Sequence, residues 1–176
     1  MRRYGYTLIE ILVVMSLTLI FVSITATYSN SGRNQINLFA SKAAVLQTIN
    51  RAKSMSISTY NEPNPPCMFG FKFDPMDDKK YYLVRIDSTG GCSGANIFSN
   101  GGIYSETVVG SYFLPDGLEF APSGQNISAI AFIPPVPRLE VWDSTISTST
   151  EGKIKISSSD GASSTLIINT SGLISY

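Results

Sequence analysis

The chain opens with a long apolar stretch. Residues 6–28 read YTLIEILVVMSLTLIFVSITATY, and Glu10 is the only carboxylate or basic side chain among them. At a rise of 1.5 Å per residue, a helix of about 23 residues is roughly 34 Å long, which exceeds the bilayer's hydrocarbon core of about 30 Å. The pattern therefore predicts a membrane-spanning helix over residues 6–28, preceded by a short basic segment, residues 1–5.

The charges that flank this stretch predict its orientation. Arg2 and Arg3 precede it, and the next charged side chain after Glu10 is Arg33. Because basic residues tend to stay on the cytoplasmic side of a membrane helix, we expect the N-terminus inside and the rest of the chain outside the cytoplasm.

Two other interpretations of the stretch are open. A cleaved secretory signal peptide usually has an apolar region of about 7–15 residues that ends at a small-residue site, whereas this stretch is longer and has a carboxylate near its start. An ordinary uncleaved anchor fits the length but leaves Glu10 unexplained, since a carboxylate in lipid costs at least about 2.5 kcal/mol. Glu10 therefore either has a cationic partner or extends its side chain to the polar interface.

After Gly32 the pattern becomes that of an amphipathic helix. Apolar side chains recur every three or four residues at Ile36, Phe39, Ala43, Leu46 and Ile49. We expect this stripe to face a protein core. The helix should continue through the amphipathic segment, residues 29–60, and end near Ser58, because the proline-rich segment 61–66 stops it.

The remaining segment, residues 61–176, has the pattern of a β-rich domain. Phe69, Phe71 and Phe73 alternate with smaller or polar residues, and a second apolar run at 81–86 follows a polar turn at 74–78. This pattern predicts a β-hairpin. Further strands are expected at 111–114, 118–120, 127–133, 138–142, 153–157, 164–169 and 173–175, with tight turns at Asp160–Gly161 and Ser171–Gly172.

These elements predict the fold class. A long N-terminal helix followed by many short strands is typical of an α+β arrangement, in which the helix packs on an antiparallel β-sheet or β-sandwich. The Ser/Thr-rich segment 144–150 offers little to bury and is expected to form a flexible loop.

The amino-acid composition limits which partners, catalytic groups and metal sites the chain can have. Thirteen Lys and Arg balance thirteen Asp and Glu, so net charge points to no partner, and the chain contains no histidine. The absence of histidine removes the commonest general base and the commonest zinc ligand. The only two cysteines, Cys67 and Cys92, cannot close a four-ligand zinc site, which leaves a disulfide or two buried thiols.

The residues Gly5-Tyr6-Thr7-Leu8-Ile9-Glu10 resemble the G-F-T-L-I-E signature of type IV prepilins and pseudopilins, with Tyr6 in place of the usual Phe. The resemblance implies a pilin-like fold. It also implies that a prepilin peptidase removes leader residues 1–5 by cutting between Gly5 and Tyr6, then methylates the new amino group of Tyr6. Residues 6–28 would remain as a transmembrane helix used in assembly.

The same resemblance implies a structural role without catalysis or cofactor. In the family, the carboxylate at the position of Glu10 meets the N-terminal amine of a neighbouring subunit as the helices pack into a filament, and such pairing offsets part of the desolvation cost of both charges. The implied partners are the prepilin peptidase, other pilin or pseudopilin subunits, an inner-membrane assembly platform and membrane lipid. The implied location is the inner membrane, single-pass with the C-terminal domain outside, and then the filament.

Less specific sequence patterns in the β-rich segment resemble one subgroup of this family. The segments GFKFD, KYYLV, PDGLEF and TLIINTSGLIS are similar to those of H-like minor pseudopilins of type II secretion. That resemblance implies a short filament that supports protein export. Two alternatives remain: a minor type IV pilin for adhesion, motility or DNA uptake, and a membrane-tethered binding domain that does not polymerise. Glu10 argues against the tip position, because the family's tip subunit commonly lacks this residue.

Other residues bear on a disulfide, on calcium binding and on nucleic acid binding. A disulfide between Cys67 and Cys92 outside the cytoplasm would close a loop of about 26 residues and stabilise by roughly 3.5 kcal/mol. Asp74, Asp77 and Asp78 could offer oxygens to calcium, but they fit an exposed turn better. Lys153 and Lys155 form only a small basic patch, and residues 157–176 have no Lys or Arg, so no nucleic acid partner is expected. The scattered acidic residues show no acid/base spacing.

Overall fold

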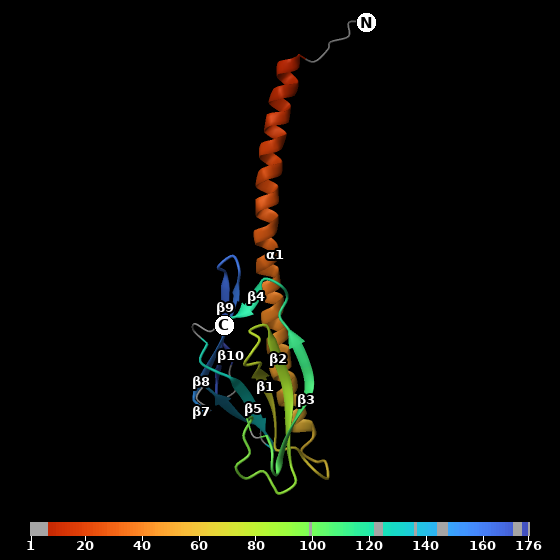
Figure 1. Ribbon diagram of the computed structural model, residues 1–176, viewed down its shortest axis with the longest axis vertical. Coiled ribbons are helices and arrows are strands. Elements are labelled where there is room, and N and C mark those ends of the chain that lie inside the picture. Colours follow the sequence, from red (N-terminus) through yellow and green to blue (C-terminus); the bar gives the residue numbers. More distant parts are fainter. Residues whose placement is uncertain are drawn as a thin grey trace.

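The computed structural model describes residues 7–98, 100–121, 125–135, 137–143, 148–170 and 174–175, with the backbone alone for 26–31 and 174–175. A long helix stands clear of the molecule at one end and packs into a β-rich domain at the other (Figure 1). This confirms the predicted α+β, pilin-like class. The elements are α1 (Leu8–Ser58), β1 (Met68–Phe73), β2 (Lys80–Ser88), β3 (Tyr104–Phe113), β4 (Leu118–Phe120), β5 (Ala129–Ile133), β6 (Arg138–Trp142), β7 (Thr148–Ser149), β8 (Glu151–Ser158), β9 (Ser163–Asn169) and β10 (Ile174–Ser175).

Helix α1 is one unbroken element of 51 residues that covers both helical segments expected from the sequence. It continues through Gly32, where the sequence pattern changes. It ends at Ser58, and the backbone N–H of the C-cap residue Thr59 donates to the carbonyl of Met55 at 3.1 Å. The prolines that follow have fixed backbone angles and cannot extend it.

The face of α1 that packs on the domain differs from the predicted stripe. Leu38, Val45, Ile49 and Ala52 are buried, whereas Ile36 and Phe39 are 69% and 65% exposed. Ala43 is exposed as well, and Leu46 is half-buried. The predicted stripe was therefore wrong except at Ile49.

Small polar residues explain this error. The buried face of α1 includes Ser41, Thr48 and Ser56, and the predicted stripe contained apolar residues alone. Ser56 donates its hydroxyl to the carbonyl of Phe132 on β5 at 3.2 Å, so the helix backbone approaches the sheet closely. At 100° per residue, Ile36 and Phe39 lie on the opposite side of the helix.

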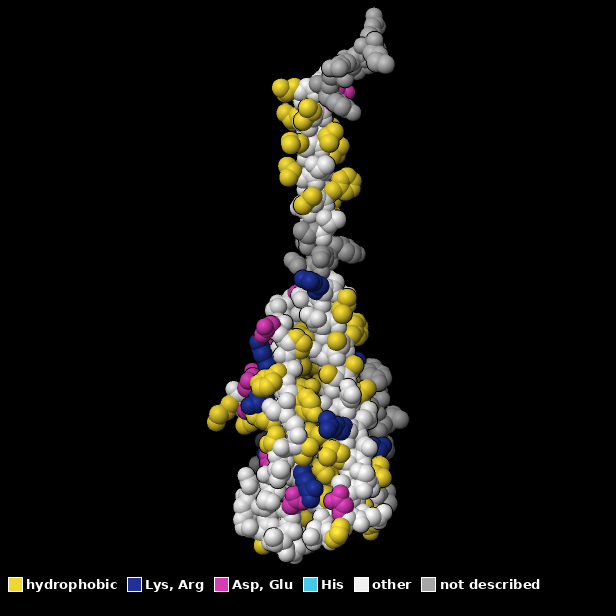
Figure 2. All heavy atoms as spheres, turned by 90° about the vertical axis from the view of Figure 1, so that its right-hand side faces the viewer, with side chains coloured by type: hydrophobic (Ala, Val, Ile, Leu, Met, Phe, Trp, Pro, Cys, Tyr) yellow, Lys and Arg dark blue, Asp and Glu magenta, His cyan; other side chains and the backbone are white. Residues whose placement is uncertain are grey.

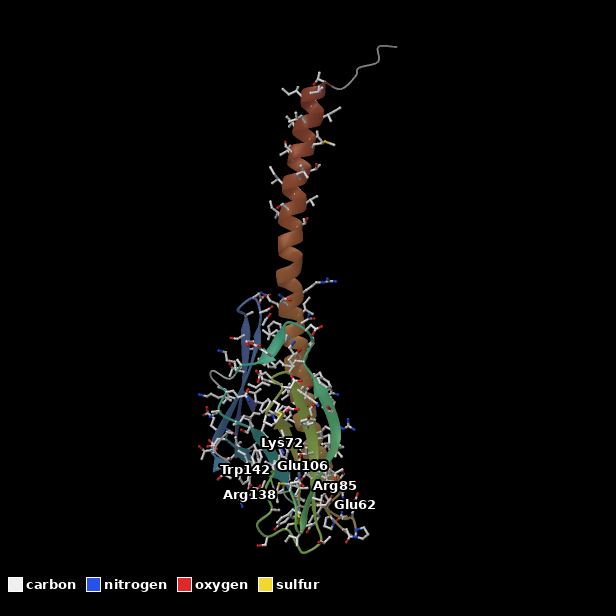
Figure 3. All side chains as sticks on the ribbon, viewed as in Figure 1. Glu62, Lys72, Arg85, Glu106, Arg138 and Trp142 are labelled. Carbon is white, nitrogen blue, oxygen red and sulfur yellow. A yellow bond between two sulfur atoms is a disulfide. The ribbon has the colours of Figure 1, made fainter. Side chains whose placement is uncertain are left out.

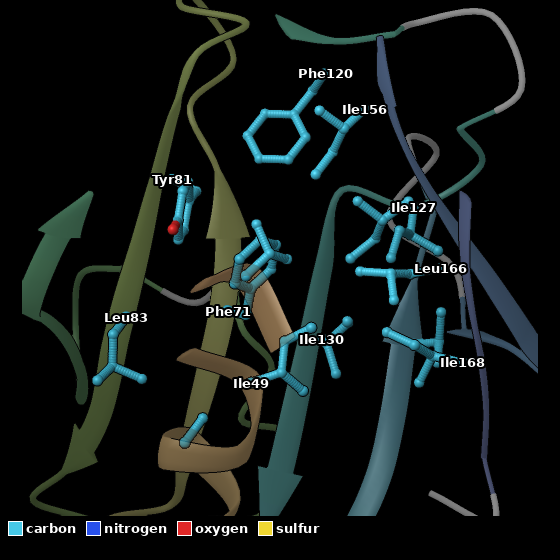
Figure 4. Packing of buried hydrophobic residues seen from close by; sticks show 14 of the residues in the cluster. Ile49, Phe71, Tyr81, Leu83, Phe120, Ile127, Ile130, Ile156, Leu166 and Ile168 are labelled. Atoms are coloured by element: carbon cyan, nitrogen blue, oxygen red, sulfur yellow. The ribbon is translucent and has the colours of Figure 1, made fainter. Parts of the chain in front are cut away.

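Two antiparallel sheets and α1 enclose the main core. The larger sheet has the strand order β3-β2-β1-β5-β6-β7, and the smaller has β10-β9-β8-β4. Ile49 of α1, Phe71 and Ile130 of the larger sheet, and Leu166 of the smaller one meet in this core (Figure 4). The predicted hairpin is confirmed as β1 and β2, with Phe71 opposite Leu83.

A second core lies on the other face of the larger sheet. The first part of the connection between β2 and β3, residues 89–98, folds over this face and buries Ile97 against the sheet. A disulfide joins Cys67 to Cys92, which confirms the predicted bond and holds the connection in place. Gly70 on β1 is needed here, because a Cβ at that position would lie 2.0 Å from Cδ1 of Ile97.

Several strand bounds also differ from the sequence prediction. β3 begins at Tyr104 instead of residue 111, and β5 begins at Ala129. β3 was predicted only from residue 111 because the residues before it, 104–110 (YSETVVG), show no alternation of apolar and polar types. Thr148 and Ser149 pair with Trp142 and Val141, so the predicted loop at 144–150 was wrong at those two positions; 144–147 lie outside the described residues.

The hairpin between β8 and β9 connects the domain to α1. Its turn at Asp160–Gly161 is confirmed, with Gly161 at a φ of 89°; the predicted turn at Ser171–Gly172 lies outside the described residues. Oδ2 of Asp160 accepts a hydrogen bond from Nδ2 of Asn34 at 3.1 Å, and Oδ1 accepts from the N–H of Ala162 at 3.2 Å. These bonds, with that to Asn34 the largest cause, lower the pKa of Asp160.

Replacing Gly70 should test the packing of the second core. We expect Gly70→Ala to destabilise the domain by about 1–3 kcal/mol, because Ile97 and the carbonyl oxygen of Ile130, 2.7 Å from the new Cβ, must both shift. Trp142 is the only tryptophan, and it packs in this core, so its fluorescence during urea unfolding in detergent gives the measurement. Gly32→Ala is the matched control: its Cβ meets nothing within 4 Å, and no loss is expected. Equal stability of both variants would contradict the packing.

The contact between Asp160 and Asn34 should make stability depend on pH. Because folding lowers the pKa of Asp160, its carboxylate stabilises the fold above its ordinary pKa, near 3.9, and this contribution is lost as pH falls through the lower folded value. Asp160→Asn should therefore melt below the wild type at pH 7, and the difference should shrink below about pH 4. Asp116→Asn, a fully exposed carboxylate 3.9 Å from Lys79, should show no such difference. A gap independent of pH would count against the carboxylate.

Candidate functional site

The N-terminal half of α1 presents an apolar surface that the domain does not cover. Residues Leu8–Thr25 have a mean hydropathy of 2.4, and none of them is buried. Figure 2 shows apolar side chains around this part of the helix, which projects beyond the folded domain. In the described part of the chain, this is the one helix long and apolar enough to cross a membrane.

The polar side chains of this half are compatible with an apolar environment. Ser16, Thr18 and Thr25 each donate a hydroxyl hydrogen bond to a backbone carbonyl three or four residues earlier, at 2.8 to 3.0 Å. A hydroxyl bonded within its own helix avoids most of the cost of being left unpaired in lipid. These three hydroxyls therefore need no water or partner.

Glu10 caps the start of α1. The N-cap residue is Thr7, whose side-chain oxygen accepts from the N–H of Glu10 at 3.4 Å, while the N–H of Thr7 donates to Oε2 of Glu10 at 2.8 Å. The Thr7 hydroxyl also donates to Oε2, at 2.9 Å. This is a capping box, which satisfies two backbone donors that a helix start leaves free.

The capping role of Thr7 was missed by the sequence analysis. Its signal is the spacing Thr-x-x-Glu just before an apolar run, and Thr7-Leu8-Ile9-Glu10 has that spacing. The box explains how an exposed carboxylate is held at the helix start within one chain. Gly5 and Tyr6, the predicted cleavage and methylation residues, lie outside the described residues.

The acidic turn considered for calcium has internal partners. Oδ2 of Asp74 accepts from the Tyr82 hydroxyl at 2.6 Å, and Oδ1 accepts from the N–H of Met76 at 2.9 Å. Asp77 accepts from the N–H of Lys79. The bond from Tyr82 is the main cause that lowers the pKa of Asp74. These bonds are those of an ordinary turn, and the part of the chain that is described holds no cluster of three metal-ligating side chains.

Other charged groups form structural pairs. Lys72 and Glu106 pair at 2.8 Å across the larger sheet (Figure 3). Arg138 pairs with Glu140 on β6 at 3.6 Å. Lys153, one of the two lysines considered for nucleic acid, pairs with Glu151 at 3.4 Å. The absence of catalysis, cofactor and nucleic acid remains a prediction.

Comparison with known protein families gives a match at the N-terminus. Residues 1–26 match the family model described as the prokaryotic N-terminal methylation motif. No curated protein and no solved structure matches the chain. The motif implies processing by prepilin peptidase and pilin-type assembly, and with the exposed apolar helix it supports a single-pass, membrane-anchored protein of structural kind. The chain thus carries the N-terminal methylation motif that is typical of the type IV pilin and pseudopilin family.

Proposed function

We propose that this chain is a structural subunit, a minor pseudopilin, of a type II secretion pseudopilus that supports protein export. It is cut between Gly5 and Tyr6, methylated on the amine of Tyr6, and assembled through α1. The observation that carries this proposal is the methylation motif at residues 1–26, which continues into an apolar helix surface that the domain leaves open. The work of such a subunit is mechanical, and no enzymatic role is proposed.

Glu10 is proposed to set the register between neighbouring helices. In an apolar helix bundle, the methylated amine of Tyr6 is a positive end and Glu10 a negative one, about four residues apart. Charges of opposite sign attract more strongly in a low-dielectric environment, and each offsets part of the other's desolvation cost. The exposed position of Glu10 at the helix start supports this role, since it is open to a neighbour.

The outer half of α1 also favours assembly. Ile36 and Phe39 are more than half exposed on the face that turns away from the sheet, and Ile57 is 51% exposed farther along the helix. Exposed apolar side chains at helical spacing fit packing against other helices. The apolar surface of α1 therefore extends beyond the proposed membrane segment, as a filament core would require.

The assignment to protein export rests on the looser sequence patterns. The first four residues of GFKFD lie on β1, KYYLV lies on β2, and the last three residues of PDGLEF form β4. A minor type IV pilin would have the same motif and architecture, so the genes beside this one would distinguish the two. In either case the proposed location is the inner membrane with the domain outside, followed by the filament. A tethered binding domain that never polymerises is the alternative of another class.

Processing can be measured directly. When the full chain is expressed with a prepilin peptidase, mass analysis should show loss of residues 1–5 and one added methyl group on Tyr6. Without the peptidase the start should stay intact. A chain that remains uncut in the presence of an active peptidase, or one cut beyond residue 28 and released, would contradict the proposal.

Removal of the Glu10 carboxylate should separate insertion from assembly. Glu10→Ala should reach the membrane at the wild-type level but lose crosslinks between neighbouring α1 helices by about tenfold or more, as the loss of a pair worth at least 1.4 kcal/mol would produce. Because both native cysteines are bonded, Leu17→Cys provides a single thiol for these crosslinks. Ser16→Ala is the control and should assemble normally. Normal assembly of Glu10→Ala would refute the role.

A further inference from the structure

A groove runs between α1 and the β2–β3 edge of the larger sheet. Its volume is about 240 Å³, and its lining residues are Ala44, Gln47, Thr48, Arg51, Tyr81 and Tyr112. All six belong to described parts of the chain, and the groove opens on the face that carries α1 and β3. Figure 2 views the molecule from this side.

The groove combines a cation with an aromatic wall. Nη1 of Arg51 donates to the Tyr112 hydroxyl at 3.3 Å, and the ring of Tyr112 stacks on that of Tyr81 with centroids 5.3 Å apart. Within the described residues, Arg51 takes part in no ion pair. A guanidinium with several free N–H donors beside an aromatic face fits a carboxylate that is accompanied by a flat ring.

The turn after α1 carries such a combination. Tyr60 is 46% exposed, and Glu62 is exposed two residues later, at the end of the molecule far from the N-terminus (Figure 3). The turn is ordered by bonds from the N–H of Thr59 to Met55 and from the N–H of Glu62 to Thr59, both 3.1 Å. Across the described part of the chain, Glu62 likewise has no ion-pair partner.

We propose that the groove of one copy receives the turn at residues 59–62 of a second copy, with Glu62 paired to Arg51 and Tyr60 against Tyr112. The two surfaces lie at different places on the chain, so the contact is heterologous. Heterologous contacts that do not close into a ring produce open helical filaments. This inference rests on the proposed function, because it assumes that the chain assembles into a filament. It adds a contact between the folded domains, outside the membrane, that the proposed function does not specify.

The direction of stagger is the same for this contact and for the proposed membrane contact. Pairing of Glu10 with the amine of a neighbour's Tyr6 displaces one helix toward its own N-terminus by about 6 Å, four residues at 1.5 Å each. The helix runs about 10 Å from Arg51 to its end at Ser58, so the turn of the displaced copy moves toward the groove of its neighbour. The lengths of the arginine and glutamate side chains cover the remaining difference.

Photo-crosslinking in the full chain tests the contact. With p-benzoyl-phenylalanine at Gln47, co-expression with a differently tagged second copy and the peptidase should give a covalent dimer whose crosslinked peptide contains residues 59–62. The same photo-reactive residue at Arg138, whose side chain is 77% exposed on β6, is the control and should give no such adduct. An adduct mapped to another segment, or to a different protein, would overturn the proposal.

A charge exchange tests the pairing. Arg51→Glu and Glu62→Arg should each reduce the adduct about tenfold, and the double exchange should restore it. Helix crosslinks through Leu17→Cys are recorded in the same membranes. Suppose that the helix crosslinks persist. If the single charge reversals then leave the groove adduct unchanged, or if the double exchange fails to restore the adduct, this inference fails and the proposed assembly stands. If the helix crosslinks are absent in the wild type as well, the proposed assembly itself fails.

Discussion

Close packing of one face of α1 against the centre of the larger sheet is the contact on which the rest of the structure depends. The helix lies mainly on β1 and β5, where Ser56 bonds to the backbone of Phe132 and Ala52 is fully buried. Small side chains bring the helix near the sheet, so that Val45 and Ile49 fill the space between them. Because this face is fixed, the orientation of the opposite face and of the projecting half is fixed as well.

Because one face of α1 is packed against the sheet, the helix has one buried face and one exposed face. Its packed face belongs to the domain, while its apolar outer face and its N-terminal half are open. A lone soluble domain gains nothing from such exposure, which costs about 25 cal/mol for each Å² of apolar surface left in water. Lipid first and neighbouring helices later would both remove that cost. The disulfide and residues 89–98 stabilise the domain on the other face of the larger sheet, away from these surfaces.

How much could be predicted from the sequence varied with the kind of signal. The long helix, the β1–β2 hairpin and β6 followed from strong local patterns, as did the motif around Glu10. The disulfide was favoured because Cys67 and Cys92 are the only cysteines and both were expected outside the cytoplasm. The prediction of which side of α1 faces the domain was wrong because serine and threonine form part of the buried face. Whether such small polar residues are buried depends on how closely the sheet packs against the helix. β3 was predicted too short because residues 104–110 show no alternation of apolar and polar types in the sequence. The groove at Arg51 joins residues from three elements and could not be seen before the fold was known.

The capping box changes how the carboxylate of Glu10 is understood. Within one chain its bonds from Thr7 both go to Oε2, so the box holds the side chain at the helix start. A carboxylate has about four acceptor sites on its two oxygens, and it can therefore keep these bonds while it accepts an amine from a second chain. Capping is therefore compatible with the proposed role of Glu10 in assembly. The capping box also gives the Glu10 carboxylate hydrogen-bond donors before assembly, when a carboxylate without partners in the membrane would cost the most free energy. A side chain held in this way loses little further freedom when a partner arrives, which favours pairing.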